Sequence, residues 1–181
     1  MVTTLLTAEP NPGHVALAEL EAGEWLKVII TQNIDNLHQK AGARRVLELH
    51  GHLRQATCIN CYRRVSSAAL LDDFLASGEV PRCKVCEGVM KPDVVLFGEQ
   101  LPIEVVNAAM EHVRQSDLML VAGSSLEVMP ASQLPLLVHE RGGKLIVVNL
   151  SSTYVDEFAE VVIHADVADA LPRIARTCME G

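Results

Sequence analysis

The stretch LMLVAGSS, residues 118–125, is a run of five apolar residues that ends directly in a small polar loop. A short run of Val, Leu and Ile without polar alternation is typical of a strand buried on both faces of a parallel sheet. Comparable runs recur along the chain and predict further strands. The candidate strands are 27–31, 46–49, 94–97, 118–122, 145–149 and 161–165.

Helical patterns separate these runs and are found at 13–26, 34–41, 103–114, 130–141 and 167–177. The helix predicted at 103–114 follows Pro102, and the helix at 130–141 ends at Gly142-Gly143, as helix boundaries often do. Strands that alternate with helices predict an α/β fold with right-handed crossovers. We therefore expect a Rossmann-like parallel sheet with helices on both faces.

Four of the five cysteines form two C-x-x-C pairs, Cys58/Cys61 and Cys83/Cys86. Two such knuckles can direct four thiolates to one point, which is the ligand set of a structural Zn²⁺ site with no open position. Disulfides and a redox C-x-x-C are the alternatives. The sequence has no secretory signal that would favour disulfides, and a redox motif would explain one pair only. Cys178 has no partner in this pattern.

The cysteine segment interrupts the alternation of strands and helices. We expect residues 52–91 to form a small inserted zinc-binding module with a short helix near 66–76. Residues 1–51 and 92–181 would then form the Rossmann-like domain. Zinc would supply much of the folding free energy of so small a module.

Polar clusters follow five of the predicted strands. Ligands of open α/β sheets bind beyond the carboxyl ends of the strands, so these clusters predict one polar cleft, although any single cluster is typical of an ordinary turn. His50 is a candidate general base because histidine is the side-chain type that most readily takes up and releases a proton near neutral pH. The clusters are Thr31-Gln32-Asn33, His50-Gly51, Gly98-Glu99, Gly123-Ser124-Ser125 and Asn149-Leu150-Ser151.

Composition restricts the partners. The 181 residues include 15 basic and 23 acidic side chains, a formal net charge of −8, and 49% hydrophobic residues. An acidic globular chain is a poor match for nucleic acid or an anionic membrane, so we expect neither as a direct partner. The apolar runs are too short to span a bilayer, and no signal peptide is recognised, so we expect a cytoplasmic protein.

Several motifs, taken in order, closely resemble the sirtuins, the NAD-dependent protein-lysine deacylases. TQNIDNLH at 31–38 and LELHG at 47–51 are followed by the two C-x-x-C pairs at the matching place. KPDVVLFGEQLP at 91–102 is similar to the sirtuin substrate-binding strand. AGSSLEVMPA at 122–131 and IVVNL at 146–150 resemble two later NAD-contacting loops. The resemblance extends over nearly the whole chain.

The resemblance implies NAD as co-substrate, one structural zinc ion and acyl-lysine proteins or peptides as partners. In the family, the acyl oxygen displaces nicotinamide, and a histidine then activates a ribose hydroxyl that takes over the acyl group. His50 would be that catalytic base. The NAD-binding residues would be Gln32, Asn33, Asp35, Gly123, Ser124, Ser125, Asn149 and Val167. Val95, Phe97, Gly98 and Glu99 would pair with the peptide backbone as an added strand, and Cys58, Cys61, Cys83 and Cys86 would hold zinc.

One part of the family pattern is not found. Sirtuins begin with a strand and a G-A-G-x-S loop, followed by a G-I-P-D-F-R segment, and we expect this chain to start after both. Such a chain would be a fragment, or a shortened protein with impaired NAD binding, and its acyl preference cannot be predicted. Two alternatives to a deacylase follow: a zinc-stabilised module that only binds acyl-lysine peptides, and a protein ADP-ribosyltransferase.

Overall fold

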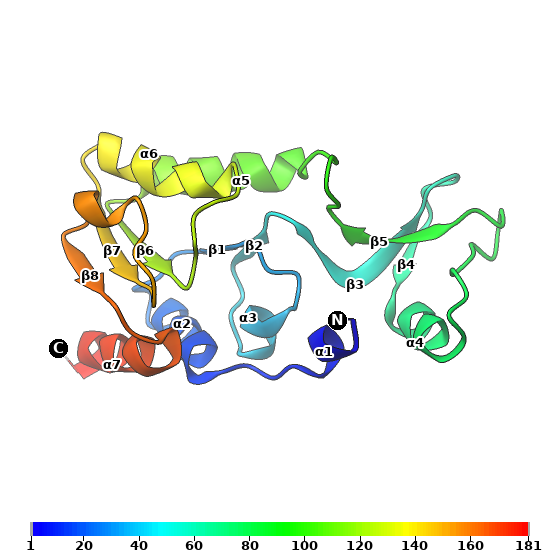
Figure 1. Ribbon diagram of the computed structural model, residues 1–181, viewed down its shortest axis with the longest axis horizontal. Coiled ribbons are helices and arrows are strands. Elements are labelled where there is room, and N and C mark those ends of the chain that lie inside the picture. Colours follow the sequence, from blue (N-terminus) through cyan, green and yellow to red (C-terminus); the bar gives the residue numbers. More distant parts are fainter. Residues whose placement is uncertain (1, 181) are drawn as a thin grey trace. The chain divides into compact units, whose positions relative to one another are not determined.

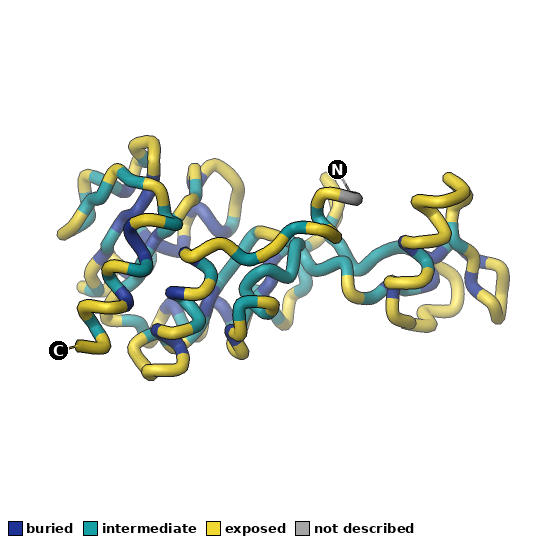
Figure 2. The backbone as a smooth tube through the Cα atoms, turned by 90° about the horizontal axis from the view of Figure 1, so that it is seen from below, coloured by how far each residue is buried: buried dark blue, intermediate teal, exposed yellow. Residues whose placement is uncertain are grey.

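The computed structural model describes residues 2–180, which fall into two compact units. The cysteine unit comprises residues up to 8, 31–36 and 48–102, and the sheet unit comprises 9–30, 37–47 and 103 onward. Two of the boundaries between the units fall inside strands, one in β1 (Ile29–Thr31) and one in β2 (Val46–Glu48). These two strands form a two-stranded sheet. Each unit has buried segments of its own (dark blue in Figure 2).

The sheet unit is built on three parallel strands in the order β6-β7-β8. These strands are β6 (Leu118–Ala122), β7 (Lys144–Val148) and β8 (Val161–Ile163). Leu145, Val147 and Val148 on the central strand are fully buried, so both faces of β7 are covered. The parallel pairing predicted from unalternated apolar runs is confirmed for these strands.

Helices cover both faces of this sheet, as predicted (Figure 1). On one side α2 (Pro12–Ala22) packs along α7 (Val167–Glu180), and Leu20 and Leu171 join Val148 in one hydrophobic cluster. On the other side α6 (Leu134–Glu140) contacts β6 and β7 and packs against α5 (Ile103–Gln115). The unit also contains α3 (Leu37–Lys40) and the 3-10 turns η1 (Ala131–Gln133) and η2 (Asp156–Phe158).

A buried carboxylate on α2 links two segments of the sheet unit. Glu21, at 5% exposure, accepts the backbone N–H groups of Arg44 and Arg45, each at 2.7 Å, and the Arg45 Nε at 3.0 Å. Burial alone would raise the pKa of Glu21, but these hydrogen bonds and the Arg45 charge outweigh it and lower the pKa. This contact joins α2 to the segment that leads into β2.

The cysteine unit contains an antiparallel sheet in the order β4-β3-β5. Its strands are β3 (Gly51–Cys58), β4 (Arg64–Ser66) and β5 (Met90–Val94), with helices α1 (Val2–Thr7) and α4 (Ala68–Ser77). Ala56, Cys58, Cys83 and Met90 form its small buried core. Gly51 has φ +74°, and a Cβ there would lie 2.0 Å from the Asp93 carbonyl oxygen, so only glycine fits where β3 meets β5.

Two predicted features differ from the structure. The strand predicted at 94–97 is wrong: β5 ends at Val94, and the residues that follow form a turn in which Glu99 Oε2 accepts the Leu96 N–H. The described parallel strands fall into two sheets rather than one, with β6, β7 and β8 in one sheet and β1 and β2 in the other. The compact unit around the cysteines spans 48–102 and takes in 31–36, and the module boundary expected at 52–91 stays a prediction. Among the described residues, no helix is long and apolar enough to cross a bilayer.

Candidate functional site

The four knuckle cysteines lie together in the cysteine unit. Their sulfur atoms are all within 4.8 Å of one another. Cys58 Sγ lies 3.5 Å from Cys86 Sγ, and Cys61 Sγ lies 3.7 Å from Cys83 Sγ. Tetrahedral ligands with Zn–S bonds of about 2.3 Å are separated by about 3.8 Å, so the spacing fits one metal ion.

The electrostatics of the cluster also favour a cation. The N–H of Cys61 contributes most among the hydrogen bonds that lower the pKa of Cys58 to about 6 against the effect of burial. The Gly88 N–H favours the Cys86 thiolate, yet the thiols of Cys58 and Cys61 raise the pKa of Cys86 to about 12. Like charges so close cannot all form unless a positive ion is shared among them. The donor set is therefore that of a metal site.

A polar pocket lies in the sheet unit at the carboxyl ends of β6, β7 and β8. Its volume is about 460 Å³. Gly123, which follows β6, has φ +58°, and its missing side chain leaves room beside Val167, the first residue of α7. Four of the expected cofactor residues, Gly123, Ser125, Asn149 and Val167, thus share one pocket. Its lining is Gly123, Ser125, Glu127, Asn149, Leu150, Ser151, Ser152, Ala165, Asp166 and Val167.

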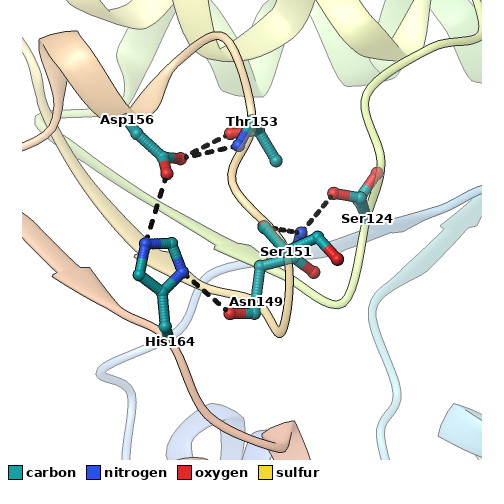
Figure 3. A network of polar contacts seen from close by, with 6 residues as sticks. All are labelled: Ser124, Asn149, Ser151, Thr153, Asp156 and His164. Carbon is teal, nitrogen blue, oxygen red and sulfur yellow. Dashed lines mark hydrogen bonds and ion pairs between the residues drawn. The ribbon is translucent and has the colours of Figure 1, made fainter.

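Asn149 connects the loops that form this pocket (Figure 3). Its side chain is buried, and Nδ2 donates to the carbonyl oxygens of Ser124 at 3.1 Å and Ser151 at 2.8 Å. Both amide hydrogens are thereby used within the protein, and Oδ1 is the atom suited to accept from a ligand hydroxyl. Ser124 does not line the pocket: its hydroxyl accepts the Leu126 N–H at 3.2 Å.

A second set of contacts holds the loop after β7. Asp156 Oδ1 accepts the backbone N–H of Thr153 at 3.2 Å and its hydroxyl at 2.7 Å. His164 Nδ1 lies 3.3 Å from the Asn149 carbonyl oxygen, and Nε2 lies 3.7 Å from Asp156 Oδ2 (Figure 3). The loops after β7 and β8 are therefore tied together next to Asn149, which lines the pocket.

Sequence reasoning missed the acidic side chains of the pocket, Glu127 and Asp166. Asp166 precedes α7, and its Oδ1 accepts the Ala168 N–H at 2.8 Å. An Asp directly before a helical pattern is a capping signal that could have indicated it. With two carboxylates and no Lys or Arg in its lining, the pocket suits hydroxyl groups better than a phosphate.

His50 lies in the cysteine unit, two residues after the end of β2. Its Nδ1 is 3.0 Å from the Gln32 carbonyl oxygen. A carbonyl oxygen can only accept, so Nδ1 carries the hydrogen, and Nε2 of the neutral ring keeps its lone pair. His50 is thus held in the tautomer that a general base acting through Nε2 requires. Asn33 and Asp35 lie in the same segment as Gln32, within 31–36 of this unit.

The segment expected to bind peptide begins beside His50, whose carbonyl oxygen accepts the Val95 N–H at 2.9 Å. It is a turn: Glu99 Oε2 accepts the Leu96 N–H at 2.9 Å and the Lys91 Nζ at 2.8 Å, and Lys91 also donates to the Val94 carbonyl. These two hydrogen bonds lower the pKa of Glu99, and the bond from the Leu96 N–H contributes more than the bond from Lys91. Phe97, between Leu96 and Gly98, is fully exposed.

The expected site residues thus form two groups, each within one unit. Gln32, His50 and the turn at 95–99 lie in the cysteine unit, whereas Gly123, Asn149 and Val167 lie in the sheet unit. The single cleft that would combine them stays a prediction.

Comparison with known proteins decides the family. The model of the Sir2 family matches residues 1–130. The chain belongs to the Sir2 family. A curated relative from Sulfurisphaera tokodaii, an NAD-dependent protein deacetylase, is 49% identical to this Sir2-family chain over 168 residues, which are 93% of the chain and 66% of the relative. NAD-dependent protein deacylase 2 of Archaeoglobus fulgidus is 45% identical over 170 residues, 93% of the chain and 67% of the relative.

Solved structures agree with the family assignment. A structure described as "Sir2-p53 peptide-NAD+" is 40% identical with a TM-score of 0.89, covering 99% of this chain and 72% of the other. "Sir2 bound to acetylated peptide" is 39% identical, also with a TM-score of 0.89, over 99% of this chain and 73% of the other. The Sir2-family chain spans about two thirds of the length of the curated relatives.

Proposed function

We propose that this chain carries the activity of an NAD-dependent protein-lysine deacylase, which cleaves NAD to nicotinamide and transfers the acyl group of lysine to ADP-ribose. The observation that carries the proposal is the environment of His50. The Gln32 carbonyl oxygen accepts the Nδ1–H of His50, and the carbonyl oxygen of His50 accepts the N–H of Val95, where the exposed turn at 95–99 begins. A base with a defined lone pair beside an exposed turn fits deacylation of a protein side chain. The names of the relatives support the same activity.

The two groups of residues suit different halves of NAD. The pocket in the sheet unit, with Asn149 and the carboxylates of Glu127 and Asp166, suits the hydroxyls and base of the adenosine half. Gly123, Ser125 and Val167 would complete that contact, and Ser124 would act by positioning the loop. Gln32, Asn33 and Asp35 would face the nicotinamide half, and NAD would supply the electrophilic ribose carbon of the reaction.

The partner would be an acyl-lysine segment of a protein, bound along Val95, Phe97, Gly98 and Glu99. Exposed apolar side chains at Leu96 and Phe97 support a role in contacting another chain. We propose Zn²⁺ as the ion of the cysteine cluster, where it would be structural because four thiolates complete its coordination. A cytoplasmic location, and no direct binding to nucleic acid, belong to the same proposal.

His50→Ala, compared with His112→Ala on α5, tests the activity. The assay is nicotinamide release from NAD in the presence and absence of an acetyl-lysine peptide. We expect peptide-dependent release by the native chain and the His112 variant, and loss of at least about 100-fold in the His50 variant. Equal turnover after His50→Ala would overturn the assignment of the base. Peptide binding without any nicotinamide release would favour a binding module instead.

A further inference from the structure

Arg54, on β3, reaches two segments of the candidate site with one guanidinium group. Its Nη1 donates to Asn36 Oδ1 at 2.7 Å and to Glu48 Oε1 at 2.8 Å, and its Nη2 donates to Glu48 Oε2 at 2.5 Å. All three residues belong to the cysteine unit. The side chain therefore bridges the segment that contains Asn33 and Asp35 to the strand that leads into His50.

The bond to Asn36 fixes the far end of the 32–36 segment. Asn36 has φ +64°, a left-handed conformation that asparagine tolerates better than most residues, and α3 begins at the next residue. The near end of the segment is Gln32, whose carbonyl oxygen accepts His50 Nδ1–H. The segment thus has one anchor on the candidate base and the other on Arg54.

The bonds to Glu48 fix the strand on the other side. Glu48 ends β2, two residues before His50, and is 9% exposed. A carboxylate so buried needs a charged partner, and the planar fork of arginine matches both of its oxygens. Lysine, a single point charge, cannot make the two Glu48 bonds and the Asn36 bond with this geometry.

We propose that Arg54 is a positioning residue that holds the 32–36 segment against the end of β2 and thereby keeps His50 in its Nδ1–H tautomer. Arg54 acts through Asn36, Glu48 and Gln32 and is not assigned any contact with NAD or peptide. The importance of that tautomer for turnover rests on the proposed function, whereas the positioning itself does not. A displacement of about 1 Å in a reacting group can cost about 100-fold in rate.

A purely structural role for Arg54 makes a different prediction. Loss of an ion pair that only stabilises the unit would lower its melting temperature and leave His50 unchanged. Arg64 provides the matched control, because its Nε lies 2.8 Å from Asp93 Oδ2 in the same antiparallel sheet and is not bonded to the 32–36 segment. Arg64→Met removes a comparable pair without touching the bridge.

The experiment compares Arg54→Met, Arg54→Lys, Asn36→Gly and Arg64→Met with the native chain. Nitrogen-15 NMR of His50 reports the tautomer, and amide hydrogen exchange reports the 32–36 segment, and neither needs turnover. We expect a pure Nδ1–H signal in the native chain and the Arg64 variant. Arg54→Met should give mixed tautomers and at least tenfold faster exchange, with partial rescue by lysine.

Turnover is measured on the same variants. If the chain is a deacylase, Arg54→Met should lower kcat about tenfold or more and change KM for NAD less. Asn36→Gly keeps the Arg54–Glu48 pair, and glycine accepts the left-handed φ of residue 36, so this variant should fold even if Arg54→Met does not. Because it removes the bond from Arg54 to Asn36, it should still speed amide hydrogen exchange at 32–36. Native His50 spectra and native exchange in both variants, or equal changes in Arg64→Met, would overturn the proposal. Absent turnover in the native chain with these spectral changes present would refute only the proposed function.

Discussion

Replacement of Asn149 by alanine tests how the pocket of the sheet unit is held open. The substitution removes two hydrogen bonds, to the carbonyl oxygens of Ser124 and Ser151. A neutral hydrogen bond contributes about 1 kcal/mol to stability, so the loss should be about 2 kcal/mol. Because Ser151 is exposed, water can satisfy its carbonyl oxygen, and the cost should not exceed this value greatly.

The same loss should appear in ligand binding. If ADP-ribose must reorder the two loops that Asn149 now orders, its affinity should fall by up to about 30-fold, the equivalent of about 2 kcal/mol. Calorimetry gives the dissociation constant, and urea unfolding gives the free energy of unfolding. Asn107→Ala, an identical deletion at an exposed position of α5, should change stability by less than about 0.5 kcal/mol. Native stability and native ADP-ribose affinity in the Asn149 variant would refute this account of the pocket.

Three further predictions concern stability, metal and peptide. Glu21→Gln should destabilise the sheet unit by about 2–3 kcal/mol, because the buried carboxylate accepts the N–H groups of Arg44 and Arg45. The pKa of Glu21 is lowered in the folded chain, so the stabilisation by this carboxylate is present above the unfolded pKa and is lost as pH falls through the folded pKa. Urea unfolding should therefore show a smaller difference in the free energy of unfolding between the native chain and Glu21→Gln at pH 3 than at pH 7. An equal difference at the two pH values would contradict this. Cys83→Ser, or treatment with a strong chelator, should cause loss of one metal ion, detected by mass spectrometry, and unfolding of the cysteine unit, detected by hydrogen exchange. Unchanged protection of β3 would contradict a structural metal. Glu99→Gln should weaken acetyl-lysine peptide binding severalfold in calorimetry by loosening the turn at Leu96, and native affinity would argue against that turn as the peptide site.

Sequence patterns predicted the features that depend on local periodicity or fixed spacing. The run LIVV in β7 and its neighbours indicated a parallel sheet, and the two C-x-x-C pairs indicated a metal cluster, because tetrahedral coordination limits ligand spacing. The strand-end rule also identified Gly123 and Asn149, which share one pocket. In these cases each residue reports directly on its own environment.

Contacts between distant segments could not be predicted in the same way. The end of β5 at Val94 depends on Lys91 and Glu99, which bind the turn that follows, and an apolar run alone does not show this. The hydrogen bonds from Asn149 Nδ2 to the carbonyl oxygens of Ser124 and Ser151 are not visible in the sequence pattern, and the expected contact of Asn149 with a ribose stays a prediction. The bridge from Arg54 to Asn36 and Glu48 joins segments up to 18 residues apart, and no periodic pattern encodes it.

The most direct test of the proposed activity is the product balance of one reaction. The chain is incubated with NAD and an acetyl-lysine peptide, and mass spectrometry counts nicotinamide, free-lysine peptide and O-acetyl-ADP-ribose. A deacylase that acts through His50 should form the three in equal amounts, and His50→Ala should form free-lysine peptide and O-acetyl-ADP-ribose at least about 100-fold more slowly. Nicotinamide released with ADP-ribose attached to protein, or equal product formation by the His50 variant, would contradict the account.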